Sequence, residues 1–583
     1  MLLGGWRVNA TREETHYETL TGRDRWLLLL VTLAVLLPGT MGVGFVDRDE
    51  GWYAQVSREM LQTGEWLIPH YLGEPWIAKP PLLYWCVAAS FKVFGLHEWA
   101  ARLISVAAMT GAVQLLARLA AGMCNRRVAI FAGLGFITAG LPAVVGKMLL
   151  TDGLLLLWCV AAQAALWRMA TRGTTAARAA GFWTLVGLGL LTKGPAILLF
   201  VGAFGVALIV CARRRHAAGQ LTGVPQPSWA WARAPKLWLA LPMVVLVGGP
   251  WYFYAARHAG GTLVDQFLWY ETASRIVHTP HGHGGPPGYY LLLSLAGWLP
   301  WTVLVPGAVI ETWRERRGAP NAWLLLLWWG LPWVALELIH SKLPHYVLPC
   351  YLPLAVMFGR MWDRGLRRLP DRRERVVLLI WACLPIVLGL GLLAGGTAAF
   401  RAGWPLALAA SGVVLAGGFG YVAWLVRRLR LLEAWTTAVA ATVLFHLVVG
   451  LCALPALEPY RLSRNVARRV NAVCDPGTEV LVSGYEEPSM FFYLEPPARV
   501  VSPPVLVAAL KPAEHSRVLV ARAEAWRAGG VEPLAPGAVW QRVRGFNYVK
   551  WRKETVWIAR VPREEVPGPV SISEATTAPA TAP

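Results

Sequence analysis

Apolar runs of about 20 residues recur along this chain from residue 26 to residue 454, and they constrain its fold more than any other feature. A helical run of this length crosses a hydrocarbon core of roughly 30 Å. Of the 583 residues, 56% are apolar and only 15% are charged. The pattern therefore predicts an α-helical polytopic membrane protein. A polar stretch of about 25 residues precedes the first run without a small-residue cleavage site, so we expect no cleaved signal peptide.

The arginines predict how the chain crosses the membrane. They form short clusters between apolar runs, which is typical of cytoplasmic loops. The net charge of +21 is therefore attributed to membrane orientation and not to nucleic-acid binding. Some apolar stretches are too long for one span, basic at both ends and interrupted in the middle, and we expect each to be a helical hairpin with its turn outside. These hairpins are 128–169, 179–212, 321–359 and 376–426.

Single spans complete the predicted topology, at 26–45, 98–120, 237–255, 288–310 and 432–454. The total is about thirteen spans with a cytoplasmic N-terminus. Residues 1–454 form the membrane domain, with long external loops at 46–97 and 256–288. Strand-like runs such as EVLVSG (Glu479–Gly484) then predict an external α/β domain over 455–570. Residues 571–583 are rich in Ala, Thr and Pro and are expected to be disordered.

Most acidic and lysine side chains fall on the predicted external side. Ionisable groups at the ends of spans are costly, so they indicate a functional site, although each one could simply end a helix. The external set comprises Asp47, Asp49, Glu50, Lys79, Asp152, Lys193, Asp265, Glu271, Arg275, Lys342 and His345.

The first external loop places an acid and a lysine about thirty residues apart. Its DRDE segment matches a capping box, which predicts that Asp47 caps a helix over Gly51–Leu61 lying in the membrane interface. A second helix is expected to start at Pro81. Lys79 beside that helix start would bind an anion such as phosphate; the alternative is a lysine that reaches to the membrane interface. A carboxylate beside such a lysine is what a transferase with a lipid-phosphate sugar donor requires.

The second external loop is rich in histidine, glycine and proline. His278, His281 and His283 could bind zinc, but their spacing fits no standard closed site and no thiolate is near. A loop that orders over bound substrate is the favoured interpretation. The eight cysteines are scattered without a C-x-x-C motif, so no metal or redox site is indicated, and a Cys452–Cys474 disulfide is a minor alternative.

Several segments carry a family resemblance. They are DEGWYAQVSREM (Asp49–Met60), GEWLIP (Gly64–Pro69), KPPLLYW (Lys79–Trp85), EWAARL (Glu98–Leu103), PPGYY (Pro286–Tyr290) and SKLPHYVLP (Ser341–Pro349). Together they resemble the bacterial aminoarabinose transferase and dolichyl-phosphate-mannose protein mannosyltransferase family, whose members are membrane glycosyltransferases of the GT-C fold. The resemblance implies about thirteen transmembrane helices, two long external loops and an extracytoplasmic C-terminal domain.

The resemblance also implies roles for individual residues. Asp49 and Asp152 look like the acids of the active cavity, with Glu50 as a further catalytic candidate. Lys79, Arg275 and Tyr346 resemble the groups that hold a polyprenyl phosphate. Less firmly, Tyr84, Lys342 and His345 are placed beside them. Aminoarabinose transferases commonly carry an acid just before the lysine, but here Ala78 stands there, so an amino sugar and a neutral hexose both remain open.

The predicted reaction is an inverting transfer from an undecaprenyl monophosphate sugar to lipid A, a cell-envelope glycan or a protein, at the bacterial inner membrane. Lys79 and Arg275 would stabilise the charge that develops on the phosphate. Asp49 would act as a base or would position the acceptor. A divalent cation held by Asp47, Asp49 and Asp152 stays open, although the resemblance implies metal independence.

Other functions fit the sequence less well. A transporter or lipid flippase is disfavoured because the chain shows no matching halves. An oligosaccharyltransferase of the same fold class would carry a Trp-Trp-Asp signature in its external domain. The one Trp-Trp pair here, Trp328–Trp329, lies inside a predicted span and is followed by Gly, so this function is disfavoured.

Overall fold

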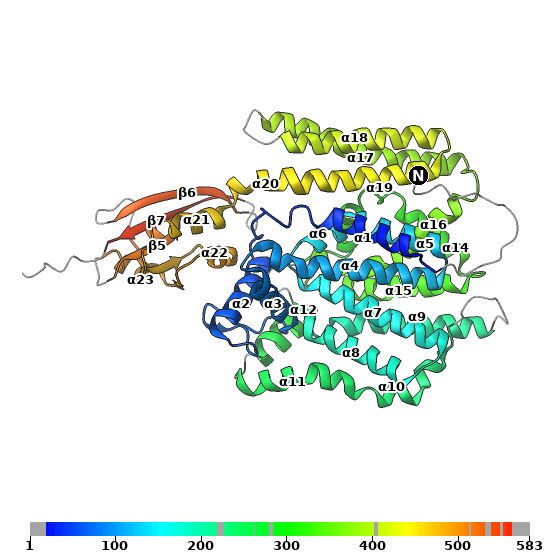
Figure 1. The fold of residues 1–583 in the computed structure, drawn as a ribbon, viewed down its shortest axis with the longest axis horizontal. Coiled ribbons are helices and arrows are strands. Elements are labelled where there is room, and N and C mark those ends of the chain that lie inside the picture. The colour runs from blue at the N-terminus through cyan, green and yellow to red at the C-terminus, as the bar shows by residue number, and fades with distance from the viewer. Residues whose placement is uncertain are drawn as a thin grey trace, which may run out of the picture. The chain divides into compact units, whose positions relative to one another are not determined.

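The computed structural model divides the chain into two compact units, Met1–Pro459 and Tyr460–Pro583 (Figure 1). The first unit is helical, and the second contains a five-stranded sheet. The structure describes residues 19–217, 227–259, 261, 263–278, 284–400, 406–511, 515–530, 538–547 and 552–562. The predicted disordered tail, 571–583, lies outside these residues, as do His281 and His283.

Long apolar helices make up most of the first unit. They are α4 (Glu98–Met123), α7 (Thr151–Arg172), α8 (Ala176–Lys193), α9 (Ala196–Ala217), α11 (Pro242–His258), α15 (Pro320–Leu338), α16 (Tyr351–Gly365), α17 (Arg372–Phe400), α18 (Leu406–Arg427) and α19 (Leu431–Val448). Within the described ranges, eight helices are long and apolar enough to cross a membrane, or nine if the bent pair α5 (Arg126–Thr138) and α6 (Gly140–Lys147) is one span. The chain is therefore a multi-pass membrane protein, while the count of about thirteen spans stays a prediction.

Three of the four predicted hairpins, 128–169, 179–212 and 321–359, break where the sequence placed the turn, and the break predicted near Arg401 in 376–426 lies outside the described residues. Between α8 and α9 the chain turns at Gly194, whose φ of +61° favours glycine. The stretch 321–359 breaks between α15 and the 3-10 helix η3 (Pro344–Cys350), which leads into α16. In the stretch 128–169 the first leg is itself bent by 64° between α5 and α6.

Two predicted single spans are wrong in detail. The stretch 288–310 is two short helices, α13 (Tyr289–Gly297) and α14 (Val305–Glu315), because Pro300 between them cannot donate a helical hydrogen bond. The first span, predicted over 26–45, is helical only as α1 (Gly22–Leu36). Leu37 still has helical backbone, and the helix stops there because Pro38 has no N–H to continue the hydrogen-bond ladder.

The first external loop folds into two helices and a small hairpin. These are α2 (Asp49–Thr63), α3 (Leu82–Phe94) and the antiparallel strands β1 (His70–Tyr71) and β2 (Glu74–Pro75). The capping prediction is wrong: the residue before α2 is Arg48, it makes no side-chain cap, and Glu50 bonds elsewhere. Helix α2 is also buried on several sides, including Tyr53, Val56 and Met60, because it packs against α3 and β1.

The second external loop contributes the π-helix η2 (Leu263–Ala273) and α12 (Ser274–Val277). Figure 1 shows α12 close to α2 and α3 at one end of the helical unit. A cluster of buried residues joins the two loops there, with Ile77 from the first and Leu263 and Phe267 from the second.

The second unit is an α/β domain with strand order β4-β3-β5-β7-β6. Strands β3 (Glu479–Ser483), β4 (Ala498–Val500) and β5 (Arg517–Arg522) are parallel; β6 (Val539–Asn547) and β7 (Arg552–Val561) are antiparallel. Its helices are α21 (Leu462–Asn471), α22 (Pro488–Tyr493), α23 (Pro503–Ala508) and α24 (Ala523–Ala528). The near-continuous burial of β3 and β5 is typical of central parallel strands. All eight cysteines are free thiols, so the Cys452–Cys474 disulfide is not formed.

Candidate active site

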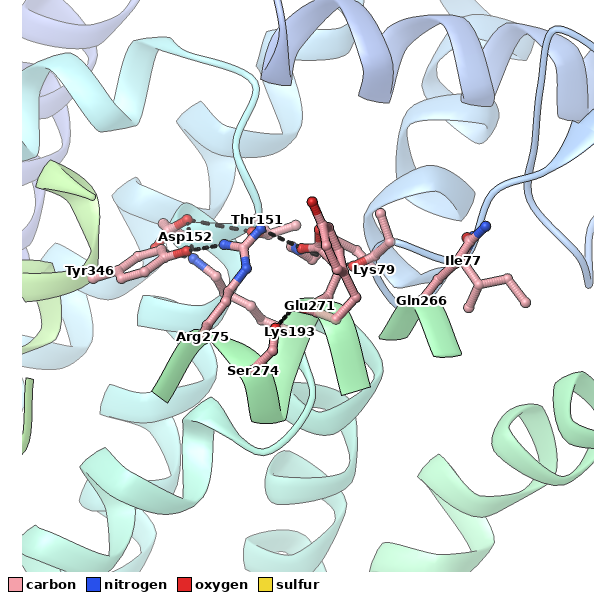
Figure 2. Close-up of polar contacts among 12 residues, drawn as sticks. Ile77, Lys79, Thr151, Asp152, Lys193, Gln266, Glu271, Ser274, Arg275 and Tyr346 are labelled. Carbon is pink, nitrogen blue, oxygen red and sulfur yellow. Dashed lines mark hydrogen bonds and ion pairs between the residues drawn. The ribbon is translucent and has the colours of Figure 1, made fainter. Parts of the chain in front are cut away.

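Two cations from distant loops meet on one carboxylate oxygen. Lys79 Nζ lies 2.5 Å from Glu271 Oε2, and Arg275 Nη2 lies 2.6 Å from the same oxygen (Figure 2). The Lys79, Arg275 and Glu271 side chains are 13%, 14% and 8% exposed, so the group is largely shielded from water. The structure thus brings together the two residues expected to hold a phosphate, and it adds an acid between them.

Local chain geometry places these three groups. Lys79 precedes Pro80 and Pro81, which lead into α3, and its Nζ also donates to the carbonyl of Ala78 at 2.9 Å. Glu271 and Arg275 are four residues apart along η2 and α12, a spacing that puts both on one helix face. The main chain of Ile77 donates to Gln266 of η2 at 3.2 Å, which fastens the segment before Lys79 to the π-helix (Figure 2).

Tyr346 extends the group from the other side. Arg275 Nη1 donates to its hydroxyl at 2.6 Å, and the Ser341 N–H donates to the Arg275 carbonyl at 3.2 Å. Burial lowers the pKa of Arg275, and the neighbouring Tyr346 and Glu271 more than offset this, so the pKa lies above its ordinary value. Arg275 therefore stays charged although its side chain is largely buried.

The charged form of Lys79 is less favoured than that of Arg275. Burial lowers its pKa below the ordinary value, and the charge of Glu271 opposes this effect only in part. The Glu271 carboxylate is thus the main group that favours the charged form of Lys79.

A second ion pair adjoins the first. Lys193 Nζ lies 2.7 Å from both carboxylate oxygens of Asp152, and His345 Nε2 lies 3.6 Å from Oδ2 (Figure 2). The same Nζ lies 4.5 Å from the ring centroid of Tyr346, which joins the two ion pairs. Burial lowers the pKa of His345, with Asp152 opposing, so the imidazole is mostly neutral near pH 7.

Asp49 and Glu50 are neighbours in sequence but have different surroundings. Asp49 is half-buried at the start of α2, and among the described hydrogen bonds none uses its carboxylate. Its charge reaches the cluster: burial raises the pKa of Tyr84, and the charges of Glu271 and Asp49 raise it further. Asp49 therefore lies close enough to Tyr84, beside this group, for its charge to act there.

Glu50 is fully buried, and both of its carboxylate oxygens accept hydrogen bonds from the chain. It accepts from Arg102 at 2.8 and 2.9 Å and from the backbone N–H groups of Val46 and Leu149, both at 2.8 Å. Burial raises its pKa, and Arg102 and these donors more than compensate, so the pKa is lowered. This geometry gives Glu50 a structural role and leaves it no carboxylate oxygen for a substrate, in contrast to the catalytic role that the sequence suggested.

The remaining candidates differ in how they join the site. Tyr84 is fully buried, with its ring 5.9 Å from that of Tyr53, and it forms part of the wall near Asp49. Lys342 Nζ donates to the carbonyl of Gly285 at 3.1 Å and lies 3.7 Å from Glu337 Oε2. These contacts place Lys342 at the end of the second loop and not on the Lys79–Arg275 group.

No group of three or more His, Cys, Asp and Glu side chains in the described ranges is arranged to hold a metal ion. Asp152 is instead bonded by Lys193. Of His278, His281 and His283, the three histidines considered as zinc ligands, only His278 is described, and it is exposed.

Sequence reasoning assigned no role to Glu271 or Lys193. The spacing of Glu271 and Arg275 is a signal for an ion pair, and Lys193 lies at a predicted hairpin turn. Neither signal identifies a partner from another part of the chain, because those contacts depend on how the loops fold over the helix ends.

Known proteins share the sequence pattern and the fold. Residues 46–260 match the family described as dolichyl-phosphate-mannose-protein mannosyltransferase. An undecaprenyl phosphate-alpha-4-amino-4-deoxy-L-arabinose arabinosyl transferase of Enterobacter sp. (strain 638) is 33% identical over 57% of this chain and 58% of its own length. A protein of the same name from Serratia proteamaculans (strain 568) is 30% identical over 76% of this chain and 79% of its own. The chain thus spans somewhat more than half of the first relative and about four fifths of the second.

The fold is also that of a solved structure. The crystal structure of ArnT from Cupriavidus metallidurans bound to undecaprenyl phosphate superposes with a TM-score of 0.70, covering 92% of this chain and 97% of that one at 20% identity. With the sequence match over most of the Serratia protein, the chain belongs to the bacterial aminoarabinose transferase family of GT-C membrane glycosyltransferases.

Proposed function

We propose that this protein transfers a sugar from a polyprenyl monophosphate carrier to an extracytoplasmic acceptor, with inversion at the sugar carbon. The observation that carries the proposal is the convergence of Lys79 and Arg275 from two separate loops. Two fixed cations beside membrane-spanning helices suit a lipid whose phosphate sits at the surface while its tail stays in the bilayer. The solved relative bound to undecaprenyl phosphate supports this carrier.

The cations would act on the leaving group. As the bond between the sugar and the phosphate breaks, negative charge grows on the phosphate oxygens. Lys79 and Arg275 are already in place and poorly hydrated, so they stabilise that charge without reorganising. Tyr346 holds the Arg275 guanidinium through its hydroxyl and so orients this donor.

Asp49 is the proposed acid on the acceptor side. Its carboxylate is not used by the described hydrogen bonds, so it can accept a proton from an attacking hydroxyl. If the acceptor is itself a phosphate, no base is needed and Asp49 positions it. Asp152 is neutralised by Lys193 and is proposed to shape the cavity together with His345.

The sugar is proposed to be an aminopentose, and the acceptor the lipid A class. The relatives named for 4-amino-4-deoxy-L-arabinose favour a pentosyl group over a hexosyl group. Ala78 stands where an acid is expected, so a nearby carboxylate such as Asp49 would have to meet the amine. The protein would act in the inner membrane, with its N-terminus in the cytoplasm and its second unit in the periplasm.

The test is a transfer assay with the purified protein in lipid nanodiscs. Undecaprenyl phosphate aminoarabinose and an undecaprenyl phosphate hexose are supplied separately with lipid A, and sugar transfer is followed by mass spectrometry. We expect transfer from the aminopentose donor and a loss of about 100-fold or more in Asp49→Asn. Asp265→Asn, at an exposed acid of the second loop, is the matched control. Transfer from neither donor, or normal turnover in Asp49→Asn, would contradict the proposal.

A further inference from the structure

The bridging oxygen of Glu271 has the environment expected for a phosphate oxygen. It accepts charge-assisted hydrogen bonds from Lys79 Nζ at 2.5 Å and from Arg275 Nη2 at 2.6 Å. Figure 2 shows this carboxylate lying between the two cations. The cation pair is thus bonded to an anion from the chain itself.

A carrier phosphate cannot simply be added to this arrangement. A phosphate that binds both cations directly would share them with the Glu271 carboxylate, and two anions would then face each other in a largely water-free site. The carboxylate must therefore move aside, or become protonated, before the phosphate is bound by both cations.

The two ion pairs of the Glu271 carboxylate join side chain to side chain, so a phosphate can replace the carboxylate at both cations without a change in the main chain. Glu271 lies in η2, a π-helix. Irregular helices of this type are common at functional sites. When a phosphate takes over the cations, it also takes over the task of keeping Lys79 charged.

The reaction makes an internal anion useful. In the donor the phosphate carries one negative charge because it is esterified on two sides. After transfer it is a monoester with up to two negative charges, and it binds fixed cations more tightly than the donor does. An enzyme without a competing anion would therefore retain its lipid product.

We propose that Glu271 is an exchangeable internal counter-anion that occupies the phosphate position in the free enzyme, yields to the donor and then competes with polyprenyl phosphate to release it. This inference rests on the proposed function. It makes Glu271 a positioning residue for the two cations and a determinant of product release.

The test is the affinity of nanodisc-embedded protein for undecaprenyl phosphate, measured with Glu271→Gln. The substitution keeps the shape and removes the charge. We expect the lipid phosphate to bind about tenfold tighter or more, because a like charge has been removed from its site. In turnover, the KM for the donor and the inhibition constant of the product both fall, and kcat falls because release slows. Glu74→Gln, an exposed acid on β2, is the control and should match the wild type.

A second variant, Glu271→Asp, keeps the charge but is too short to bridge both cations. It should bind undecaprenyl phosphate with an affinity between those of the wild type and the Gln variant, and it decides the question if the Gln variant does not fold. Unchanged or weaker binding in the folded variants would overturn the inference, since Glu271 would then only brace the cations. Failure of the wild type itself to bind undecaprenyl phosphate would instead overturn the proposed function.

Discussion

The Glu50–Arg102 pair and the Lys79–Glu271–Arg275 group are both shielded from water, yet they are bonded in different ways. Glu50 accepts two backbone N–H groups, and Arg102 donates to the carbonyls of Val43 and Gly44 at 2.6 and 2.9 Å. In the second group Glu271 Oε2 binds two side chains. The Glu50–Arg102 pair is bonded to the main chain through both of its partners, whereas the bonds of Glu271 Oε2 to Lys79 and Arg275 join side chain to side chain. We therefore expect the first pair to stabilise the fold and the second group to exchange partners during function.

The largest expected effect is on the Glu50–Arg102 pair. Glu50→Gln leaves Arg102 without its buried counter-charge, and we expect the free energy of unfolding to fall by about 3–5 kcal/mol. Since the folded pKa of Glu50 is lowered, its stabilisation is complete above the unfolded value of 4.5 and is lost as the pH falls below it. Thermal unfolding in detergent, from pH 8 down to well below pH 4.5, measures both. Glu74→Gln should unfold like the wild type; equal stability of the two variants would remove the distinction between the regions.

The next largest effect is expected at Lys79, in the Lys79–Glu271–Arg275 group. Lys79→Ala should lower turnover by about 100-fold or more, because one of two preplaced cations is lost from the leaving phosphate. Its melting temperature should change far less than that of Glu50→Gln, since Lys79 donates only one described bond to the main chain. Lys92→Ala, at an exposed position on α3, serves as the control. A Lys79→Ala protein that melts early but turns over normally would reverse the assignment.

The smallest effect is expected at Tyr346, which contacts the same group through Arg275. Tyr346→Phe removes the hydroxyl that holds Arg275, and loss of a hydrogen bond to a charged group is worth about 1.5–3 kcal/mol at most. We expect the donor KM to rise by roughly tenfold with a smaller change in kcat, as measured by initial rates over a donor series. Tyr421→Phe on α18 is the control because its side chain is exposed. A fall in kcat alone would mean that Tyr346 acts on the reacting atoms and not on phosphate binding.

Much of the helical layout follows from local sequence. The arginine clusters and the Gly194 turn locate the hairpin of α8 and α9 because both signals act over a few residues. The error at 288–310 has a local cause as well, since Pro300 interrupts a run whose composition alone suggests one span. The DRDE motif failed because burial beside Arg102 competes with helix capping for the Glu50 carboxylate.

The candidate site was less predictable than the fold. Asp49 and Glu50 look equivalent in sequence, but successive helix positions point about 100° apart, so only the Glu50 carboxylate bonds to Arg102. The meeting of Lys79 and Arg275 was expected through the family resemblance, whereas the residue between them depends on the register of a π-helix, which local preferences do not set. The environment of Glu271 could be recognised only in three dimensions.

The turn at Gly194 links parts of the site that are otherwise separate. A β-carbon at this position would lie 2.6 Å from the ring of Phe267, which is buried in η2. The residue before the turn is Lys193, the partner of Asp152, and four residues after Phe267 comes Glu271. Because glycine has no β-carbon, the backbone at the end of α8 can pack directly against the Phe267 ring of η2. We therefore expect a shift of η2 against this turn to change the positions of Lys193 and Glu271 together.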